Sequence, residues 1–181
     1  GTTKPGLRIS ARIAGFSAST ISNSSGSFIL RLPPMPAGGP HTLKVTADSR
    51  GESVAVKDVM IGEVWICSGQ SNMEMLVKSA CPDPDPMDCT AIRMVTVKPT
   101  AEMGRATTFK GEWKHAVSGN IPEFSAAGYF FARRLHSELG VPVGMISTSW
   151  GGTRIEAWIS RESLMRMPVT EQLVRDYEAS L

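Results

Sequence analysis

The sequence predicts a protein of the α/β class, in which a parallel sheet with flanking helices follows a set of β-sandwich strands. Short apolar runs near Val64, Arg93 and Val143 are typical of strands buried on both faces of a parallel sheet. The first third of the chain instead alternates apolar and polar residues, as half-buried antiparallel strands do. With 181 residues and 41% hydrophobic content, the chain can bury a sizeable core in one or two domains.

The amino-terminal region is expected to contain short antiparallel strands. Residues 7–13 alternate apolar and polar side chains. Residues 27–32 and 42–47 are two further strand candidates, separated by a turn rich in proline and glycine. The pattern is typical of part of a β-sandwich.

A domain boundary is expected near Val56, where alternation gives way to continuous apolar runs. This boundary divides the chain into a β-rich region, 1–56, and an α/β region, 57–181. The β-rich region either supports packing or presents a carbohydrate-binding surface. Packing support is favoured because Phe16 and Phe28 are its only aromatic residues.

The run from Val64 to Cys67 ends abruptly in small and amide residues around Ser71. Proteins with parallel sheets place ligands and chemistry just beyond the carboxyl ends of the strands, which is where Ser71 is expected. A helix over residues 72–78 would direct free backbone N–H groups at developing negative charge. Taken alone, the segment fits equally well a serine that only caps a helix.

The second half of the chain contains one clear helix. Residues 125–139 carry an apolar set at helical spacing, with Ser125 as the cap and Gly140 as the stop. That apolar set includes Tyr129, Phe130, Ala132 and Leu135. Residues 98–124 show no clear period and are expected to form a long loop near the pocket, and residues 170–181 read as a charged helix or tail.

A second special loop follows the apolar run near Val143. Gly151 and Gly152 lie beyond that run, and a glycine pair lets a substrate approach the backbone closely. Two strand ends therefore carry loops suited to chemistry.

The two loops together resemble the sialate O-acetylesterase family. The resemblance rests on Ser-Gly-Gln-Ser-Asn-Met at residues 68–73 and Trp-Gly-Gly-Thr-Arg-Ile-Glu-Ala-Trp at residues 150–158, and it covers most of residues 54–160. Members of this family are SGNH-type serine esterases that remove acetyl groups from sugar hydroxyls. The resemblance implies an SGNH or flavodoxin-like parallel sheet, of which this chain would be the amino-terminal portion.

The resemblance also implies roles for individual residues. Ser71 corresponds to the nucleophile, whose hydroxyl would form an acetyl-enzyme. The backbone N–H of Ser71 and one from Gly151 or Gly152 would donate to the oxyanion. Gln70 and Asn72 are expected to hold the loop or line the pocket, because neutral amides have no pKa suited to proton transfer.

The later positions of the second motif are expected to line the pocket or support the loop. Glu156 could bond neighbouring backbone or Arg154, and Trp158 could form the floor of the site. A buried ion pair and a core tryptophan are the structural alternatives. Arg154 could equally pair with the carboxylate of a sialate.

A serine nucleophile needs a base, and the three histidines are poor candidates. His41 lies in the β-rich region, His136 lies on the predicted helix as an exposed residue, and His115 has no nearby Asp-x-x-His pattern. The resemblance places the catalytic Asp and His near the carboxyl end of the family, beyond this sequence. A second polypeptide or a missing carboxyl-terminal segment is therefore an expected partner.

The cysteines predict one disulfide. Cys81 and Cys89 bracket a loop of prolines and aspartates, and a bond between them would indicate an extracytoplasmic protein that is secreted, periplasmic or lysosomal. Calcium binding by that loop is the alternative, but the glycine and closing glutamate of an EF-hand are absent, so no metal is expected. Cys67 is expected to be an inert core residue.

Charge and hydropathy argue against two classes of function, nucleic-acid binding and membrane spanning. A net charge of +2 without a basic run argues against a nucleic-acid partner, and no apolar stretch approaches the roughly 20 residues that span a bilayer. No cofactor is expected. Two hypotheses remain: a serine esterase acting on O-acetylated sialic acid or acetylated plant polysaccharide such as xylan, and a non-catalytic carbohydrate-binding module that retains the esterase scaffold.

Overall fold

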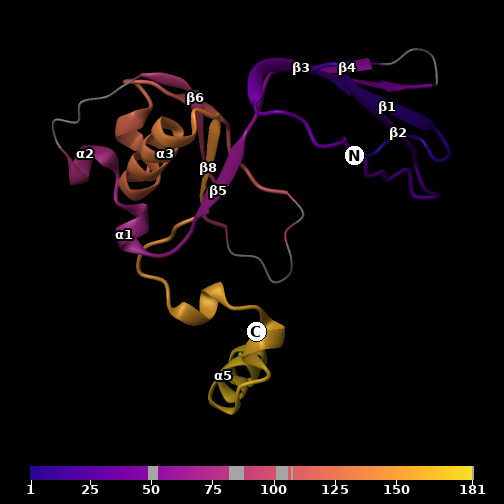
Figure 1. The fold of residues 1–181 in the computed structure, drawn as a ribbon. Coiled ribbons are helices and arrows are strands. Elements are labelled where there is room, and N and C mark those ends of the chain that lie inside the picture. Colours follow the sequence, from indigo (N-terminus) through magenta and orange to yellow (C-terminus); the bar gives the residue numbers. More distant parts are fainter. Residues whose placement is uncertain (49–52, 82–87, 101–105, 107, 181) are drawn as a thin grey trace.

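Two four-stranded sheets joined through Gly62 make up most of the computed structural model (Figure 1). The structure describes residues 1–48, 53–81, 88–100, 106 and 108–180. The first sheet uses residues from the amino-terminal third, and the second carries the helices. Close backbone approach explains the glycine at the junction, because a Cβ at Gly62 would lie 2.8 Å from the Pro142 carbonyl carbon.

The amino-terminal sheet is antiparallel throughout. Its strands are β1 (Arg8–Ile13), β2 (Phe16–Ile21), β3 (Gly38–Ala47) and β4 (Ser53–Ile61), in the order β2-β1-β3-β4. The predicted strand at 7–13 is confirmed, since alternate residues of β1 are buried. A β-sandwich requires a second sheet packed face to face on this one. Among the described residues, no sheet packs on it in that way.

The other two strand predictions for this region have different outcomes. The candidate at 42–47 is confirmed within β3. The candidate at 27–32 is wrong, because Ser27 forms only an isolated bridge with Thr2. Strands β2 and β4 were not predicted, and β4 continues through Val56, the expected boundary.

The second sheet is mixed, with the order β5-β8-β6-β7. Strands β5 (Glu63–Cys67), β8 (Val143–Ser147) and β6 (Cys89–Thr96) are parallel, as expected for the runs near Val64, Arg93 and Val143. Strand β7 (Lys114–Ala116) pairs antiparallel with β6. It lies with the short helix η1 (Ile121–Glu123) in the segment expected to be a loop, so that expectation is wrong there.

Helix α3 (Ala126–Leu139) covers one face of this sheet. It begins and ends as predicted: the Ser125 hydroxyl accepts from the Gly128 N–H at 3.2 Å, and Gly140 adopts the left-handed conformation. Tyr129 and Ala132 are fully buried against strand residues that include Val143 and Met145. Phe130, placed in the apolar set by the sequence pattern, is exposed.

Strand β5 differs from the expectation that it is buried on both faces. It is the edge strand of its sheet, and Val64 and Ile66 are 63% and 68% exposed. Trp65 points to the other face, where its ring meets Phe131 of α3 edge to face with centroids 5.1 Å apart. The described residues leave the face that carries Val64 and Ile66 largely uncovered, whereas α3 packs on the opposite face.

The remaining helices are short or peripheral. They are α1 (Ser71–Glu74), α2 (Val77–Ala80), η2 (Ile155–Trp158), α4 (Arg161–Leu164) and α5 (Pro168–Ala179). Figure 1 shows α5 extending away from both sheets, and of the two expectations for the carboxyl end, a charged helix or a tail, the helix is formed. No helix among the described residues has the length and apolar character needed to cross a membrane.

The predicted disulfide is absent, because Cys81 and Cys89 are both free thiols. Each cysteine is held by its own element: Cys81 caps α2, and Cys89 opens β6 and pairs with Ala116. Residues 82–87, including two of the loop's aspartates, lie outside the described residues. An extracytoplasmic location rests on this disulfide, so no location follows from the structure.

Candidate active site

Ser71 lies just beyond the carboxyl end of β5, as the sequence predicts. The strand ends at Cys67, Gly69 turns the chain with a φ of 144°, and Ser71 is the first residue of α1. The first-turn N–H groups of Met73 and Glu74 donate to the Gln70 carbonyl, at 3.0 and 2.9 Å. The Ser71 N–H has no partner among the described residues, so it is available to an incoming oxygen.

The loop after β8 runs beside the loop after β5. The Thr148 N–H donates to the Cys67 carbonyl at 2.8 Å, and the Trp150 N–H donates to the Gly69 carbonyl at 2.9 Å. These bonds continue the parallel pairing past the ends of both strands. The two sequence motifs therefore meet at the end of the sheet where the parallel strands β5 and β8 finish.

Side chains of the first loop hold the glycine turn of the second. The Glu74 carboxylate accepts a hydrogen bond from the Gly151 N–H at 2.8 Å, and the Gln70 side-chain amide donates to the Thr153 carbonyl. A Cβ at Gly151 would lie 3.6 Å from the Ser71 Cα and would overlap the Glu74 carboxylate. Only glycine fits this close approach without displacement of a neighbour.

Glu74 is the residue that the sequence interpretation missed. A carboxylate in the first turn of a helix is commonly explained by its favourable interaction with the helix dipole. That explanation gives no reason to expect a contact with a distant loop. Its position three residues after Ser71 is the one available signal, since a residue one turn along a helix lies on the same side.

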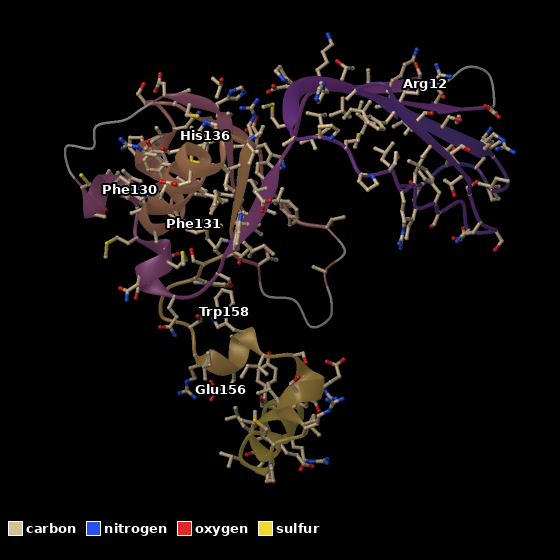
Figure 2. All side chains as sticks on the ribbon, in the orientation of Figure 1. Arg12, Phe130, Phe131, His136, Glu156 and Trp158 are labelled. Carbon is tan, nitrogen blue, oxygen red and sulfur yellow. The ribbon has the colours of Figure 1, made fainter. Side chains whose placement is uncertain are left out.

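Trp158 supports the second loop. Its indole N–H donates to the Thr153 hydroxyl at 2.8 Å, and that hydroxyl donates to the Trp150 carbonyl at 2.8 Å. Figure 2 shows Trp158 on the segment that leads from the sheet toward α5. Of the two expectations for Trp158, these contacts favour loop support.

The other predicted pocket residues make fewer contacts. Asn72 and Arg154 are exposed, and Glu156 is half-buried. Arg154 and Glu156 form no ion pair with each other in the described part of the chain, so the buried pair considered from the sequence is not formed. The guanidinium of Arg154 is left available to a ligand.

None of the three histidines is bonded to Ser71. His136 bonds the Val141 carbonyl at 2.7 Å, near the amino end of β8, and His41 lies on β3 of the other sheet. His115 Nε2 lies 3.1 Å from the Asp58 carboxylate on β4. This aspartate partner was not foreseen because the two residues are 57 positions apart.

The Asp58–His115 pair lies at the wrong end of the sheet for Ser71. Arg93 joins it, with Nη2 2.7 Å from the Asp58 carboxylate, and the three residues line a pocket with Glu63 and Pro142. Those last two residues mark the amino ends of β5 and β8, whereas Ser71 follows a carboxyl end. The pair therefore cannot serve as the base and acid for Ser71.

Cys67 ends the strand that leads to Ser71, and its thiol is buried. Burial raises the pKa of the Cys67 thiol, which disfavours the reactive thiolate, and Cys67 lies in the core as expected. Nowhere in the described ranges do three His, Cys, Asp or Glu side chains gather as metal ligands would. The arrangement can present a hydroxyl and backbone N–H donors to a carbonyl substrate.

A family model and curated relatives match most of the chain. Residues 61–179 match the family described as "Carbohydrate esterase, sialic acid-specific acetylesterase". The sialate O-acetylesterases of Pongo abelii and Homo sapiens are 35% and 34% identical over 162 residues, which is 82% of this chain but 31% of each relative.

A solved carbohydrate acetylesterase from Xanthomonas citri matches 91% of this chain with a TM-score of 0.82 and 34% identity, over 39% of its own length. The chain thus spans about a third of the curated relatives it matches. On the family match over residues 61–179, this chain belongs to the sialic acid-specific acetylesterase family of carbohydrate esterases.

Proposed function

We propose that the complete protein is a serine esterase that hydrolyses O-acetyl groups of carbohydrates, with Ser71 as its nucleophile. The observation that carries this proposal is the approach of the Gly151 turn to Ser71 at the carboxyl edge of the sheet. Family membership and the named activity of the relatives support the same reaction.

In the proposed reaction, the Ser71 hydroxyl attacks the acetyl carbonyl and transfers its proton to a base. The tetrahedral intermediate expels the sugar oxygen, which takes that proton, and leaves an acetyl group on Ser71. Water, deprotonated by the same base, then releases acetate and restores the hydroxyl. No cofactor takes part.

Two backbone donors are proposed for the oxyanion. One is the unpartnered N–H of Ser71. The other is the N–H of Gly152 rather than Gly151, because the Gly151 N–H already donates to the Glu74 carboxylate. Loss of one such donor typically costs about 10²–10³ in rate.

The base and its orienting acid are proposed to lie outside these 181 residues, in a carboxyl-terminal segment or a second polypeptide. This part of the proposal is supported by the engagement of His115 and His136 elsewhere and by the chain's short coverage of its relatives. The chain alone is therefore expected to be inactive.

The proposed substrate is an O-acetylated sugar, with a sialate favoured over acetylated xylan. The exposed guanidinium of Arg154, next to the glycine turn, offers a partner for the carboxylate that sialate carries and xylan backbone sugars lack. The names of the mammalian relatives point the same way.

The test uses the full-length gene product and measures acetate released from a 9-O-acetylated sialoside and from acetylated xylan. Ser71→Ala is expected to lower the rate at least about 10³-fold, and Ser79→Ala on the exposed face of α2 serves as the control. Binding of the sugar without acetate release by the wild type would instead favour a carbohydrate-binding module.

A further inference from the structure

We propose that the pocket between β4 and the second sheet is a binding site for a neutral sugar unit, separate from the site at Ser71. The pocket has a volume of about 490 Å³, which lies within the range of small-molecule sites. Strand β4 forms one wall, and residues of the second sheet form the other. The chemistry of these walls, rather than the proposed esterase activity, identifies the class of ligand.

The backbone at Asp58 is the first observation. Leu43 pairs with Val56 and His41 pairs with Val59, so β4 has one more residue than β3 between these two pairs, which is a β-bulge. Asp58 lies inside the bulge with a φ of 59°, in the left-handed region that residues other than glycine rarely adopt. Bulges redirect side chains next to sites, and strained backbone conformations cluster at sites as well.

The bulge brings the Asp58 carboxylate to two side chains of the other sheet. Arg93 Nη2 lies 2.7 Å from this carboxylate, and His115 Nε2 lies 3.1 Å from it. The buried Nη1 of Arg93 has no hydrogen-bond partner among the described residues. An ion pair that served only to join the sheets could use both guanidinium nitrogens, and native folds rarely leave a buried donor unsatisfied.

The same cluster is open to a ligand. The side chains of Asp58 and His115 are 46% and 42% exposed. A carboxylate has about four lone-pair sites, of which Arg93 and His115 use two. The polar wall therefore retains acceptors and donors that a hydroxyl group, which both donates and accepts, can satisfy.

An apolar surface lies opposite these polar groups. The Trp113 side chain lines the pocket and is 47% exposed. A Cβ at Gly144 would lie 3.4 Å from the Trp113 ring and 3.5 Å from Val64, so the ring and Val64 both approach this glycine closely. A pyranose ring has C–H groups on its faces and hydroxyls around its rim. Its face would pack on the indole while its rim reached the Asp58 cluster.

The charges on the pocket walls favour a neutral ligand. Lys57 and Arg93 contribute two positive charges, and Asp58 and Glu63 contribute two negative charges. A site lined by one sign of charge attracts ligands of the opposite sign, and this pocket has no such excess. A purely apolar ligand would cover the polar cluster without bonding to it, which is costly. A neutral sugar satisfies both walls.

The pocket is too far from Ser71 for one sugar ring to occupy both sites. It lies at the amino ends of β5 and β8, whereas Ser71 follows the carboxyl end of β5. The five residues of β5 span about 17 Å at the rise of an extended strand. Sugar binding in the pocket does not require Ser71 to be a nucleophile, so the two proposals can fail independently.

A photoreactive sugar tests the location of the site. The methyl β-glycosides of glucose, galactose and xylose, each carrying a diazirine, are photolysed with the full-length gene product, and the modified peptides are mapped. At least one of the three is expected to form adducts within residues 53–64 or 113–116. Adducts confined to the loops of Ser71 and Gly151, or no adduct in folded protein, would overturn the proposal.

Ligand-observed NMR then measures the affinity of the glycoside that labels the pocket. Trp113→Ala is expected to weaken binding about tenfold. Phe109→Ala, at an exposed aromatic residue that does not line the pocket, is the matched control and is expected to change affinity less than twofold. His115→Ala, which leaves the Asp58–Arg93 pair in place, is a second variant with the same expected direction. Wild-type affinity in folded Trp113→Ala and His115→Ala proteins would contradict the site.

A charged analogue tests the class of ligand. The uronide that bears a carboxylate on the same ring is expected to bind no more tightly than the neutral glycoside. Binding of the neutral glycoside is expected to be the same at 50 and 500 mM salt, because salt screens attraction between charges. Tighter binding of the uronide would show that the pocket is an anion site and would overturn the assignment to a neutral sugar.

Discussion

Gly151 is the position where one added carbon would most directly disturb the candidate site. Gly151→Ala places a methyl group on the Glu74 carboxylate and close to the Ser71 Cα. Small displacements of a positioning group can cost about 100-fold in rate. We therefore expect the full-length enzyme to lose about 100-fold in kcat/KM for an acetyl ester.

The matched control for this substitution is Gly119→Ala. A Cβ at Gly119 meets nothing within 4 Å, and the residue lies near η1, away from Ser71. Activity within twofold of wild type is expected for the control. If both variants keep full activity, the Glu74–Gly151 contact does not position the turn for catalysis.

Cys67 gives a second prediction for a single residue. Its buried thiol has a raised pKa, so the fraction present as the reactive thiolate at pH 8 is smaller than for an ordinary cysteine. In the native protein, iodoacetamide is expected to modify the partly exposed Cys81 and Cys89 first. Peptide mapping over time checks the order, and early modification of Cys67 would contradict its burial.

At the scale of elements, α3 is the helix that local sequence specifies most fully. Its cap, its apolar spacing and its terminal glycine all lie within the helix or next to it. Ser125 does more than cap, since its hydroxyl also donates to the Met73 carbonyl at 2.6 Å and so ties α3 to α1. The helix and the loop of Ser71 are thereby held together.

Ser125→Ala is expected to lower the free energy of unfolding by about 1–2 kcal/mol, because both contacts are lost from a buried site. Chemical denaturation measures the change. Ser160→Ala removes a similar cap from the short, peripheral α4 and is expected to have a smaller effect. Equal effects would show that the link to Met73 adds nothing.

Elements that depend on distant partners were harder to predict. Strand β7 has three residues and exists because it pairs with β6, and β2 consists largely of serine, threonine and alanine with little apolar contrast. Asp58 was hard to predict for the same reason, because its partners are distant in the sequence. Its left-handed backbone and its contacts with Arg93 and His115 arise where the two sheets meet.

The candidate active site likewise contains residues that their own segment predicts and contacts that depend on distant residues. Ser71 and the glycine pair could be predicted because each follows an apolar strand within its own segment. The Glu74–Gly151 bond joins residues 77 positions apart, and nothing in either segment indicates it. The expected Cys81–Cys89 bond was wrong because spacing alone does not show how neighbouring elements hold each thiol.

At the scale of the whole molecule, the chain carries part of the proposed esterase site. Ser71 and the glycine turn of the second loop lie together at the carboxyl ends of β5 and β8, whereas the three histidines lie elsewhere. The chain spans about a third of the length of its relatives, and the proposal that the base lies elsewhere in the gene product rests on the positions of these histidines together with that coverage.

Fluorophosphonate labelling of the full-length gene product, followed by peptide mapping, tests the central claim most directly, because only an activated serine reacts quickly with this probe. The account predicts rapid labelling at Ser71 that is abolished by Ser71→Ala and is absent from residues 1–181 alone. Folded full-length protein that leaves Ser71 unlabelled, or that is labelled at a different serine, would contradict it.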